Sequence, residues 1–335
     1  MARGQNQKEK LYRLIQILKS TDEKHGITMA EVIEKMNAYG VDASRKSIYE
    51  DIKTINDMMD CDYEIGTYRD GARTRYYMVG RPFDLAEVKL LADAVAASKF
   101  ITVRKTYELI EKLKTLVSKA DGVTLERSGL EVDGKRHSQN TSGIYSLDNL
   151  FKAIRENRKV SFKYFGWDVD KSMKFHRDDG LYTVSPWKVL IDDGYYYLVG
   201  FDEGAGEAGE IRNYRVDKMV NVRTKEGPRI GEELFKKERP DDYTTVHFDM
   251  FGGEVESVKL LCKNEMSNVI VDRFGNEVTM MPAGQDKFTV VVNVSPSERF
   301  ISWISSFEDS IKIVGPESVV QKMKEHVKKL SEVYS

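Results

Sequence analysis

The sequence predicts a multidomain α+β protein, mainly helical in its first half and rich in short strand-forming segments in its second. The chain has 335 residues, and because domains usually span ~100–200 residues, two or three domains are expected. Hydrophobic residues make up 41% of it, enough for a core in each domain. No apolar run approaches the roughly 18 residues that a membrane helix needs, and the opening MARGQNQKEK is too polar for a secretory signal. We therefore expect a cytoplasmic protein with no membrane partner.

Three amphipathic helices are predicted near the N-terminus. Apolar residues at helical spacing predict the first over residues 8–20. The second begins at Thr28, because Glu31 follows three residues later in the capping-box pattern, and it ends near Gly40. The third is predicted over residues 44–57, where isoleucines spaced by four and three residues form a buried stripe.

A β-hairpin is predicted directly after these helices. Strand-forming residues flank Asp70-Gly71, a dipeptide that suits a tight turn. Three helices and a hairpin within residues 1–80 are the plan of a winged helix-turn-helix domain, which binds DNA. An ordinary helical domain with no DNA-binding role fits the same pattern.

Basic and polar side chains gather on two of these elements. Residues 1–80 hold 13 Lys+Arg and 13 Asp+Glu, so a double-stranded DNA operator must be bound by a local patch and not by net charge. A helix in the major groove reads base edges, and a cationic hairpin suits phosphates or the minor groove. The residues expected to contact DNA are Arg45, Lys46, Ser47, Tyr49 and Lys53 on the third helix, and Arg69, Arg73 and Arg75 on the hairpin.

Residues 81–142 are predicted to be a helical linker followed by a loop. Two more amphipathic helices meet near Thr102. The stretch 120–142 is polar and contains several glycines, which indicates a loop and a domain boundary.

The second half of the chain divides into two further predicted domains. Residues 143–230 begin with one helix and continue as short strands separated by turn signals, a pattern typical of a small barrel or a strongly bent sheet. Residues 240–335 alternate strand-forming and helical stretches, which predicts a small α+β domain.

A formal GxGxxG motif stands at Gly204, Gly206 and Gly209. Dinucleotide binding through this motif requires a helix after the glycines, because the phosphate lies at the helix N-terminus. The sequel from Glu210 to Val216 has the pattern of a strand. We interpret the motif as a flexible hairpin loop.

No group of residues supports catalysis or a cofactor. The carboxylate pairs Asp178-Asp179 and Asp192-Asp193 are adjacent at turns, where neighbouring side chains point apart. Cys61 and Cys262 form no CxxC pair, and the five histidines show no metal-ligand spacing. We therefore expect neither an enzyme, nor a metal site, nor a cofactor.

One block of the second half carries a family resemblance. The tripeptide Tyr196-Tyr197-Leu198 is followed by a strand in which the order of residue types is distinctive: Arg212, Tyr214, Arg215, Asp217 and Lys218. This resembles the WYL domain of bacterial transcription regulators, with Tyr196 in place of the usual tryptophan. The last domain resembles the WCX-type C-terminal extension of these regulators, with Trp303 and Gly315-Pro316 near its characteristic positions.

The resemblance implies an Sm-like β-barrel that senses a ligand, often a nucleotide or nucleic acid, coupled to a DNA-binding head in a homodimer. The expected effector-binding residues are Trp187, Tyr196, Arg212 and Arg215. Arginine and tyrosine together suit phosphate pairing and base stacking. Arg212 and Arg215 lie on opposite faces of a regular strand, so they converge only at a bulge or a barrel rim. The alternative is that the tyrosines are barrel core and the arginines pair with Asp217 or Glu210.

Two functional hypotheses follow. The first is a transcriptional regulator that binds operator DNA as a dimer and responds to an anionic nucleotide or nucleic-acid effector. The second is an accessory protein that binds single-stranded nucleic acid through its barrel without sequence-specific operator binding.

Overall fold

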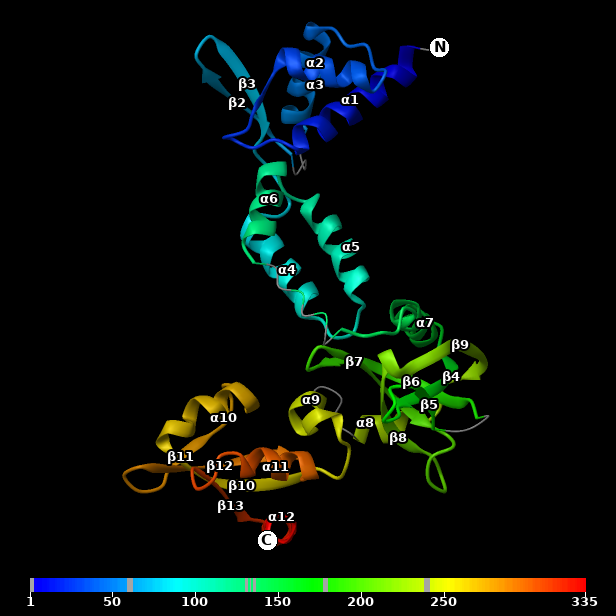
Figure 1. Cartoon of the computed structure of the whole chain (residues 1–335), viewed down its shortest axis with the longest axis vertical. Coiled ribbons are helices and arrows are strands. Elements are labelled where there is room, and N and C mark those ends of the chain that lie inside the picture. The colour runs from blue at the N-terminus through cyan, green and yellow to red at the C-terminus, as the bar shows by residue number, and fades with distance from the viewer. Residues whose placement is uncertain are drawn as a thin grey trace. The chain divides into compact units, whose positions relative to one another are not determined.

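The computed structural model describes residues 3–58, 63–129, 132, 134, 137–176, 180–237 and 242–335, with side chains from residue 7 onward. Cys61 and the Asp178-Asp179 pair lie outside these residues. The chain forms two compact units, residues 1–139 and residues 140–335 (Figure 1). No helix in the described part of the chain is both long and apolar enough to cross a membrane.

The first unit begins with three helices and a small antiparallel sheet, which we call the head. Its elements are α1 (Arg3–Lys19), β1 (Ile27–Thr28), α2 (Met29–Ala38), α3 (Arg45–Asp57), β2 (Ile65–Asp70) and β3 (Arg73–Met78). The strands pair in the order β1-β3-β2. Asp70 pairs with Arg73, so the hairpin loop is Gly71-Ala72, one residue later than the Asp70-Gly71 turn expected from the sequence. The positive φ of Gly71 (60°) provides the sharp reversal.

The head has its own apolar core and well-capped helices. Leu14, Val32 and Ile48 are fully buried in one cluster that joins the three helices to the sheet. Thr28 and Glu31 form the predicted capping box at the start of α2. The next helix, α3, begins one residue after its capping serine. These local signals explain why the starts of both helices could be predicted from the sequence.

Three further helices complete the first unit: α4 (Leu85–Ala97), α5 (Val103–Lys114) and α6 (Lys119–Arg127). The last of them corrects the expected loop over residues 120–142. Ser118 caps α6 by accepting a hydrogen bond from the amide of Asp121 (3.1 Å), and Leu125 is buried with Val88 and Val117. This burial stabilises a helix in a segment whose polar and glycine-rich composition indicates a loop.

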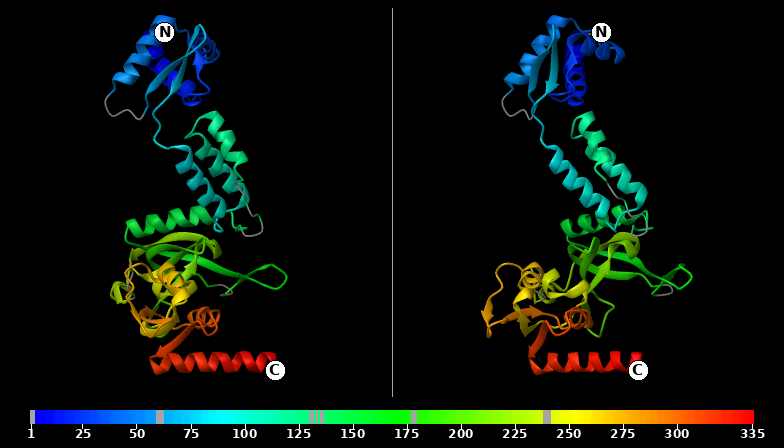
Figure 2. Two further views of the ribbon diagram at one scale, coloured as in Figure 1. Left: turned by 90° about the vertical axis from the view of Figure 1, so that its left-hand side faces the viewer. Right: turned by 60° about the vertical axis from the view of Figure 1, so that its left-hand side comes forward.

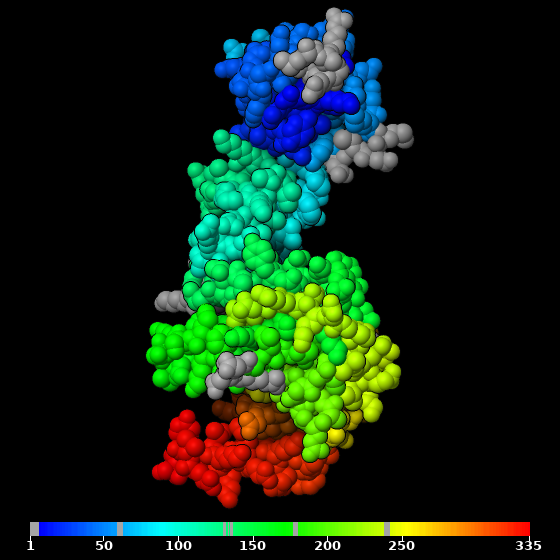
Figure 3. Space-filling model, turned by 90° about the vertical axis from the view of Figure 1, so that its right-hand side faces the viewer, coloured from blue at the N-terminus to red at the C-terminus, as the bar shows by residue number. Residues whose placement is uncertain are grey.

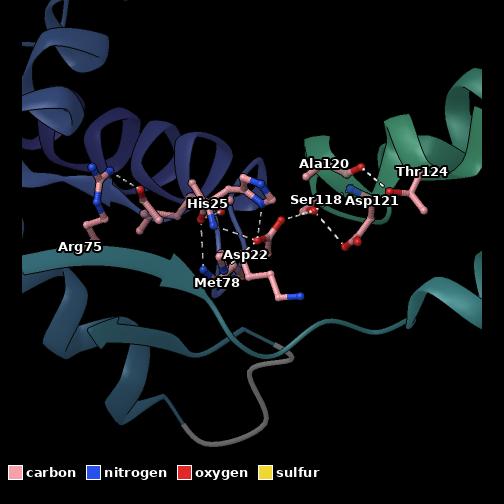
Figure 4. A network of polar contacts seen from close by, with 12 residues as sticks. Asp22, His25, Arg75, Met78, Ser118, Ala120, Asp121 and Thr124 are labelled. Atoms are coloured by element: carbon pink, nitrogen blue, oxygen red, sulfur yellow. Dashed lines mark hydrogen bonds and ion pairs between the residues drawn. The ribbon is translucent and has the colours of Figure 1, made fainter. Parts of the chain in front are cut away.

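The head and the helical segment are joined by a polar network (Figure 4). The Ser118 hydroxyl donates to the Asp22 carboxylate (2.6 Å), which also contacts the His25 ring (2.8 Å). Burial raises the pKa of Asp22, but the hydrogen bonds from Ser118 and His25 outweigh it and the pKa is lowered. Arg81 donates to the carbonyl oxygens of Lys19 (3.0 Å) and Thr21 at the end of α1. Both views in Figure 2 place α6 next to the head.

The second unit contains a curled six-stranded sheet that forms half a barrel. Its elements are α7 (Gly143–Arg155), β4 (Arg158–Trp167), β5 (Met173–Phe175), β6 (Tyr182–Asp192), β7 (Tyr195–Asp202), β8 (Glu210–Arg215), η1 (Val216–Lys218) and β9 (Met219–Pro228). The strand order is β5-β4-β6-β7-β8, and β9 pairs with β4 over residues 158–164, before the segment of β4 that pairs with β5. The loop with the GxGxxG motif joins β7 to β8, so a strand follows its glycines, as expected.

Aromatic side chains fill the concave side of this sheet. Phe162 stacks on Tyr182, with ring centroids 5.5 Å apart, and meets Tyr214 edge to face at 5.2 Å. The Tyr214 hydroxyl donates to the carboxylate of Asp202, a fully buried residue (2.5 Å). Burial of the tyrosine, together with this hydrogen bond, raises the pKa of Tyr214.

The rest of the second unit is a connecting segment and an α+β layer. Its elements are α8 (Glu232–Lys237), α9 (Tyr243–Val246), η2 (Phe248–Met250), β10 (Glu256–Lys263), η3 (Asn264–Met266), α10 (Ser267–Phe274), β11 (Met280–Pro282), β12 (Lys287–Val294), α11 (Glu298–Ser305), β13 (Ile311–Gly315) and α12 (Glu317–Tyr334). The strand order is β11-β12-β10-β13, and Ile270, Phe300 and Val319 from three helices pack on this sheet. The long helix α12, red in Figure 3, exposes Val333 and Tyr334 near its end.

Substituting Tyr214→Phe tests the buried hydroxyl. We expect the free energy of unfolding of the second unit to fall by about 1–3 kcal/mol, because the buried Asp202 carboxylate loses a donor. All three tryptophans of the chain lie in this unit, so urea unfolding followed by tryptophan fluorescence measures it. Tyr145→Phe, at a side chain 74% exposed, is the control and should change the value by less than about 0.5 kcal/mol. Equal effects of the two substitutions would contradict a stabilising role of the hydrogen bond from Tyr214 to Asp202.

Candidate functional site

A cavity of about 840 Å³ opens beside strands β7 and β8 in the second unit. A volume of this size suits a ligand of the order of a nucleotide. Its lining comes from the curled sheet and from the segment that leads into the C-terminal layer. The lining includes Tyr164, Asp192, Tyr195, Tyr197, Arg212, Asn213, Arg215, Asp249, Met250, Phe251 and Arg299.

Arg215 is the most strongly positioned cation of the cavity. Its guanidinium donates two hydrogen bonds to Asp217 (3.1 and 2.8 Å) and lies 3.5 Å from the centroid of the Tyr195 ring. Burial lowers the pKa of Arg215, but the pairing with buried Asp217 outweighs it and the pKa is raised. The arginine therefore stays charged, with its orientation determined by one carboxylate and one ring.

Arg212 lines the same cavity in a more exposed setting. It donates two hydrogen bonds to Glu210 on its own strand (3.2 and 3.1 Å), and these raise its pKa. The pairing of β7 with β8 is regular, with Gly200 opposite Arg212 and Tyr197 opposite Arg215. Both arginines reach the cavity without a bulge because β8 is an edge strand of the sheet. The ion pairs considered as the alternative in the sequence are thus present, and the same arginines line the cavity.

The curled sheet contributes three tyrosines to the cavity lining, and none of them was a predicted site residue. Tyr195 and Tyr197 lie on one face of β7, and Tyr164 comes from β4. The Tyr164 hydroxyl accepts a hydrogen bond from the backbone amide of Arg215 (3.2 Å). Burial raises the pKa of Tyr197 to about 12, so it is a neutral donor at neutral pH. The alternation of side chains along a strand was the available signal for the pair on β7.

Tyr196 and Trp187, both predicted as effector contacts, are not part of this cavity lining. Tyr196 alternates with the two lining tyrosines of β7, which places it on the other face of the strand. The pairing of β6 with β7 slips between Pro186 and Lys188, so Trp187 is a bulge residue. Its indole donates to the carbonyl of Ile230 (3.1 Å) and stacks on Phe235 with centroids 5.7 Å apart.

The predicted DNA-contacting residues of the head differ in how firmly they are held. Arg45 donates to the Tyr49 hydroxyl (3.2 and 3.1 Å), and that hydroxyl also meets Tyr76 of strand β3. A hydrogen bond from Tyr76, and a second from Arg45, lower the pKa of Tyr49; burial raises that of Tyr76 to about 12. This chain of contacts joins helix α3 to the hairpin.

The remaining head residues divide between exposed and internal positions. Lys46, Lys53, Arg69 and Arg73 are exposed, and the Ser47 hydroxyl donates to the Ser44 carbonyl (3.2 Å). Arg75 binds Asp70 (2.8 Å) and the carbonyl of Gly26 (2.8 Å), which holds the hairpin against the loop before α2. Within the described residues, no three His, Cys, Asp or Glu side chains are grouped to hold a metal ion.

The strands that line the cavity lie in a segment that matches a known domain family. Residues 146–224 match the model of the WYL domain, and residues 254–331 match that of the WCX domain. The second unit therefore contains a WYL domain followed by a WCX domain. The resemblance read from Tyr196-Tyr197-Leu198 and from the strand that begins at Arg212 is confirmed.

Two solved structures are similar to this chain. One is the proteasome accessory factor B/C (PafBC) of Arthrobacter aurescens, at 16% identity over 95% of this chain and 47% of that chain, with a TM-score of 0.31. The other is a CRISPR Cas-related protein, at 11% identity over 97% of this chain and 85% of that chain, with a TM-score of 0.38. The chain thus spans about half the length of the PafBC chain. No curated protein matches the sequence.

Asp217→Asn tests the pairing that orients Arg215. The amide no longer neutralises the half-buried guanidinium, so we expect the free energy of unfolding of the second unit to fall by about 1.5–3 kcal/mol. Urea unfolding followed by tryptophan fluorescence measures this. Asp168→Asn removes the partner of Lys174, whose side chain is exposed (3.6 Å), and should have little effect. A loss for Asp217→Asn no larger than that of the control would show that the pair is dispensable.

Proposed function

We propose that this protein is a transcriptional regulator that binds duplex DNA through its head and an anionic effector of the nucleotide or nucleic-acid type through its WYL domain. The observation that carries the proposal is the cavity in which Arg212 and Arg215 lie beside the tyrosines of β7 and β4. Charged arginines pair with phosphates, and tyrosine rings stack with bases. The WYL and WCX domains support the same assignment.

The head is proposed to be a winged helix-turn-helix domain. Helix α3 presents Arg45 and Lys46 near its N-terminus and Lys53 about two turns further along, with the hairpin β2-β3 as the wing. A helix with exposed basic residues at its first turn suits entry into a major groove. The exposed Arg69 and Arg73 are then the wing residues placed for phosphate or minor-groove contact, whereas Arg75 has a role in holding the wing.

The regulator is proposed to act in the cytoplasm as a homodimer. Two heads would read half-sites about one helical turn, or a multiple of it, apart. Effector binding in the second unit would change how the two heads are spaced. This division of labour matches the chain's two compact units, one with the basic helix face and one with the cavity.

The proposed DNA contacts predict two distinct phenotypes. Arg73→Ala should weaken binding to all duplex sequences similarly and reduce the slope of log affinity against log salt by about 1, because a phosphate contact is lost. Lys46→Ala should alter sequence preference, with a cost of about 1–3 kcal/mol on the preferred site, if it reads a base edge. Anisotropy titrations with duplexes from the protein's own upstream region measure both.

Lys112→Ala is the matched control, because Lys112 is an exposed cation of α5 outside the head. Its affinity and salt slope should equal those of the unaltered protein. Binding of single strands alone, with no duplex binding, would overturn the regulator and favour the accessory-protein hypothesis.

The ion pair between Arg212 and Glu210 predicts opposite effects of two substitutions on effector affinity. Arg212→Ala removes a phosphate partner and should weaken binding of a short 5′-phosphorylated single strand by about tenfold or more. Glu210→Gln removes the competitor that holds Arg212 (3.1 Å), and should strengthen binding. Titration calorimetry measures both, with an unchanged thermal melt as the folding control. Unchanged affinity in both variants would show that the effector does not bind at these arginines.

A further inference from the structure

The cavity lining contains two chemically different groups of residues. One group is Arg212, Arg215 and the tyrosines of β7. The other group carries carboxylates and comes partly from outside the WYL domain: Asp192 is the last residue of β6, and Asp249 and Phe251 belong to the segment that enters the WCX domain. A simple phosphate site has no use for carboxylates, because they repel the anion.

We call the second group of lining residues, which includes Asp192, Asp249, Phe251 and Arg299, the wall. Its backbone is held by specific contacts. Asp249 and Met250 both adopt left-handed backbone conformations, with φ of 50° and 60°. Non-glycine residues in this region are uncommon and persist where surrounding contacts hold them. Here the Asn213 side chain donates to the carbonyl of Met250 (2.7 Å) and accepts from the Tyr243 hydroxyl (3.1 Å). Asn213 lies on β8 between the two arginines, so the wall is tied to the strand that carries the cations.

The wall also contains an aromatic ring, that of Phe251, and a third arginine, Arg299. The Phe251 side chain is 50% exposed although Phe248 and Met250 before it are buried. The Arg299 guanidinium lies 5.2 Å from the Phe251 ring centroid and 3.6 Å from the Asp249 carboxylate. A half-exposed ring beside an arginine in a cavity is the arrangement on which bases stack.

We propose that this wall recognises the base of a nucleotide unit whose phosphate lies at Arg212 and Arg215: the base stacks on Phe251, and Asp192 and Asp249 accept hydrogen bonds from its N–H groups. Carboxylates accept and do not donate, so the wall favours bases with several donors on one edge. Guanine presents two adjacent donor groups, and thymine presents one. The site therefore prefers a guanine-containing unit. This inference rests on the proposed effector role of the two arginines.

Asp192 lies close to two other carboxylates, those of Asp249 and Asp193. Burial raises the pKa of its carboxyl, Arg273 opposes this, and Asp249 and Asp193 add to it. Arg273 lies with its guanidinium 3.9 Å from the Phe248 ring centroid, behind the wall. A base whose N–H groups lie between these carboxylates relieves the repulsion between them, which is a physical reason for base recognition by the wall.

The test is a titration of the full chain with two sets of probes. One set is the nucleoside 5′-monophosphates together with ribose 5-phosphate. The other is a set of 5′-phosphorylated trinucleotides with thymidine at both ends and guanosine, cytidine, thymidine or an abasic sugar in the centre. We expect at least one set to bind about tenfold more tightly with guanine than without a base, and more tightly with guanine than with uracil or thymine. Binding of the first set identifies a free nucleotide, and binding of the second alone identifies a single strand.

Two variants locate the recognition. Phe251→Ala should bring the guanine-containing probe down to the affinity of its base-free analogue while leaving the analogue unchanged, and Asp249→Asn should reduce the preference for guanine. Phe175→Ala, at another partly exposed ring on β5 outside the cavity lining, is the control and should change neither.

The outcomes separate this inference from the function on which it rests. Equal affinity of the unaltered protein for probes with and without a base, lost in Arg212→Ala, overturns the base-reading wall and keeps the effector site. A base preference that persists in Phe251→Ala also overturns the wall. Failure of every probe to bind overturns the effector site and the wall together.

Discussion

Strand β8 is the element on which the second unit depends, because each of its faces makes a different set of contacts. Tyr214 points into the aromatic core and donates to the buried Asp202. Asn213 bonds to the segment that leads into the WCX domain, and Arg215 is oriented by Asp217. A shift of one residue in register would exchange these roles, burying a cation and exposing the core tyrosine. The continuous pairing from Asp202 with Glu210 to Tyr197 with Arg215 prevents this.

The cavity arginines are neutralised in the structure by carboxylates of different kinds. Asp217 is buried and serves to orient Arg215, whereas the Glu210 side chain is about half exposed and is a competitor that an anionic ligand can displace. Replacing the carboxylate contact by a phosphate contact costs less than creating a charge contact from nothing, since the guanidinium is already partly desolvated. The site is thus suited to a ligand that exchanges with internal partners, which is the behaviour expected of a sensor.

The first unit shows a comparable division among its cations. Arg75 and Arg81 are bound to backbone carbonyls and stabilise the fold, while Arg73 and Lys46 remain exposed. The network of Asp22 with Ser118 connects the end of α1 to the start of α6 through side chains 96 positions apart. The head is therefore attached to the helical segment by hydrogen bonds and not by the connecting chain alone.

Much of the local structure was readable from single stretches of sequence. The capping box at Thr28, the isoleucine stripe of α3 and the hairpin after it are determined by neighbours a few residues apart. Helix α6 was missed because its stability comes from burial of Leu125 against helices α4 and α5 and not from its own composition. Trp187, expected from the sequence as an effector contact, lies at a bulge in β6 and is not among the residues that line the cavity.

The sequence by itself determined the helices and hairpin of the head, the WYL motif and the two arginines at the candidate site. Only the tertiary structure decided which aromatic side chains join them, because the face that a residue presents depends on the edge position and register of its strand. It also decided that Phe251 and Arg299, far from β8 in sequence, complete the cavity. Contacts of this range are set by how the WYL sheet and the C-terminal segment pack, and no local pattern of residues encodes them.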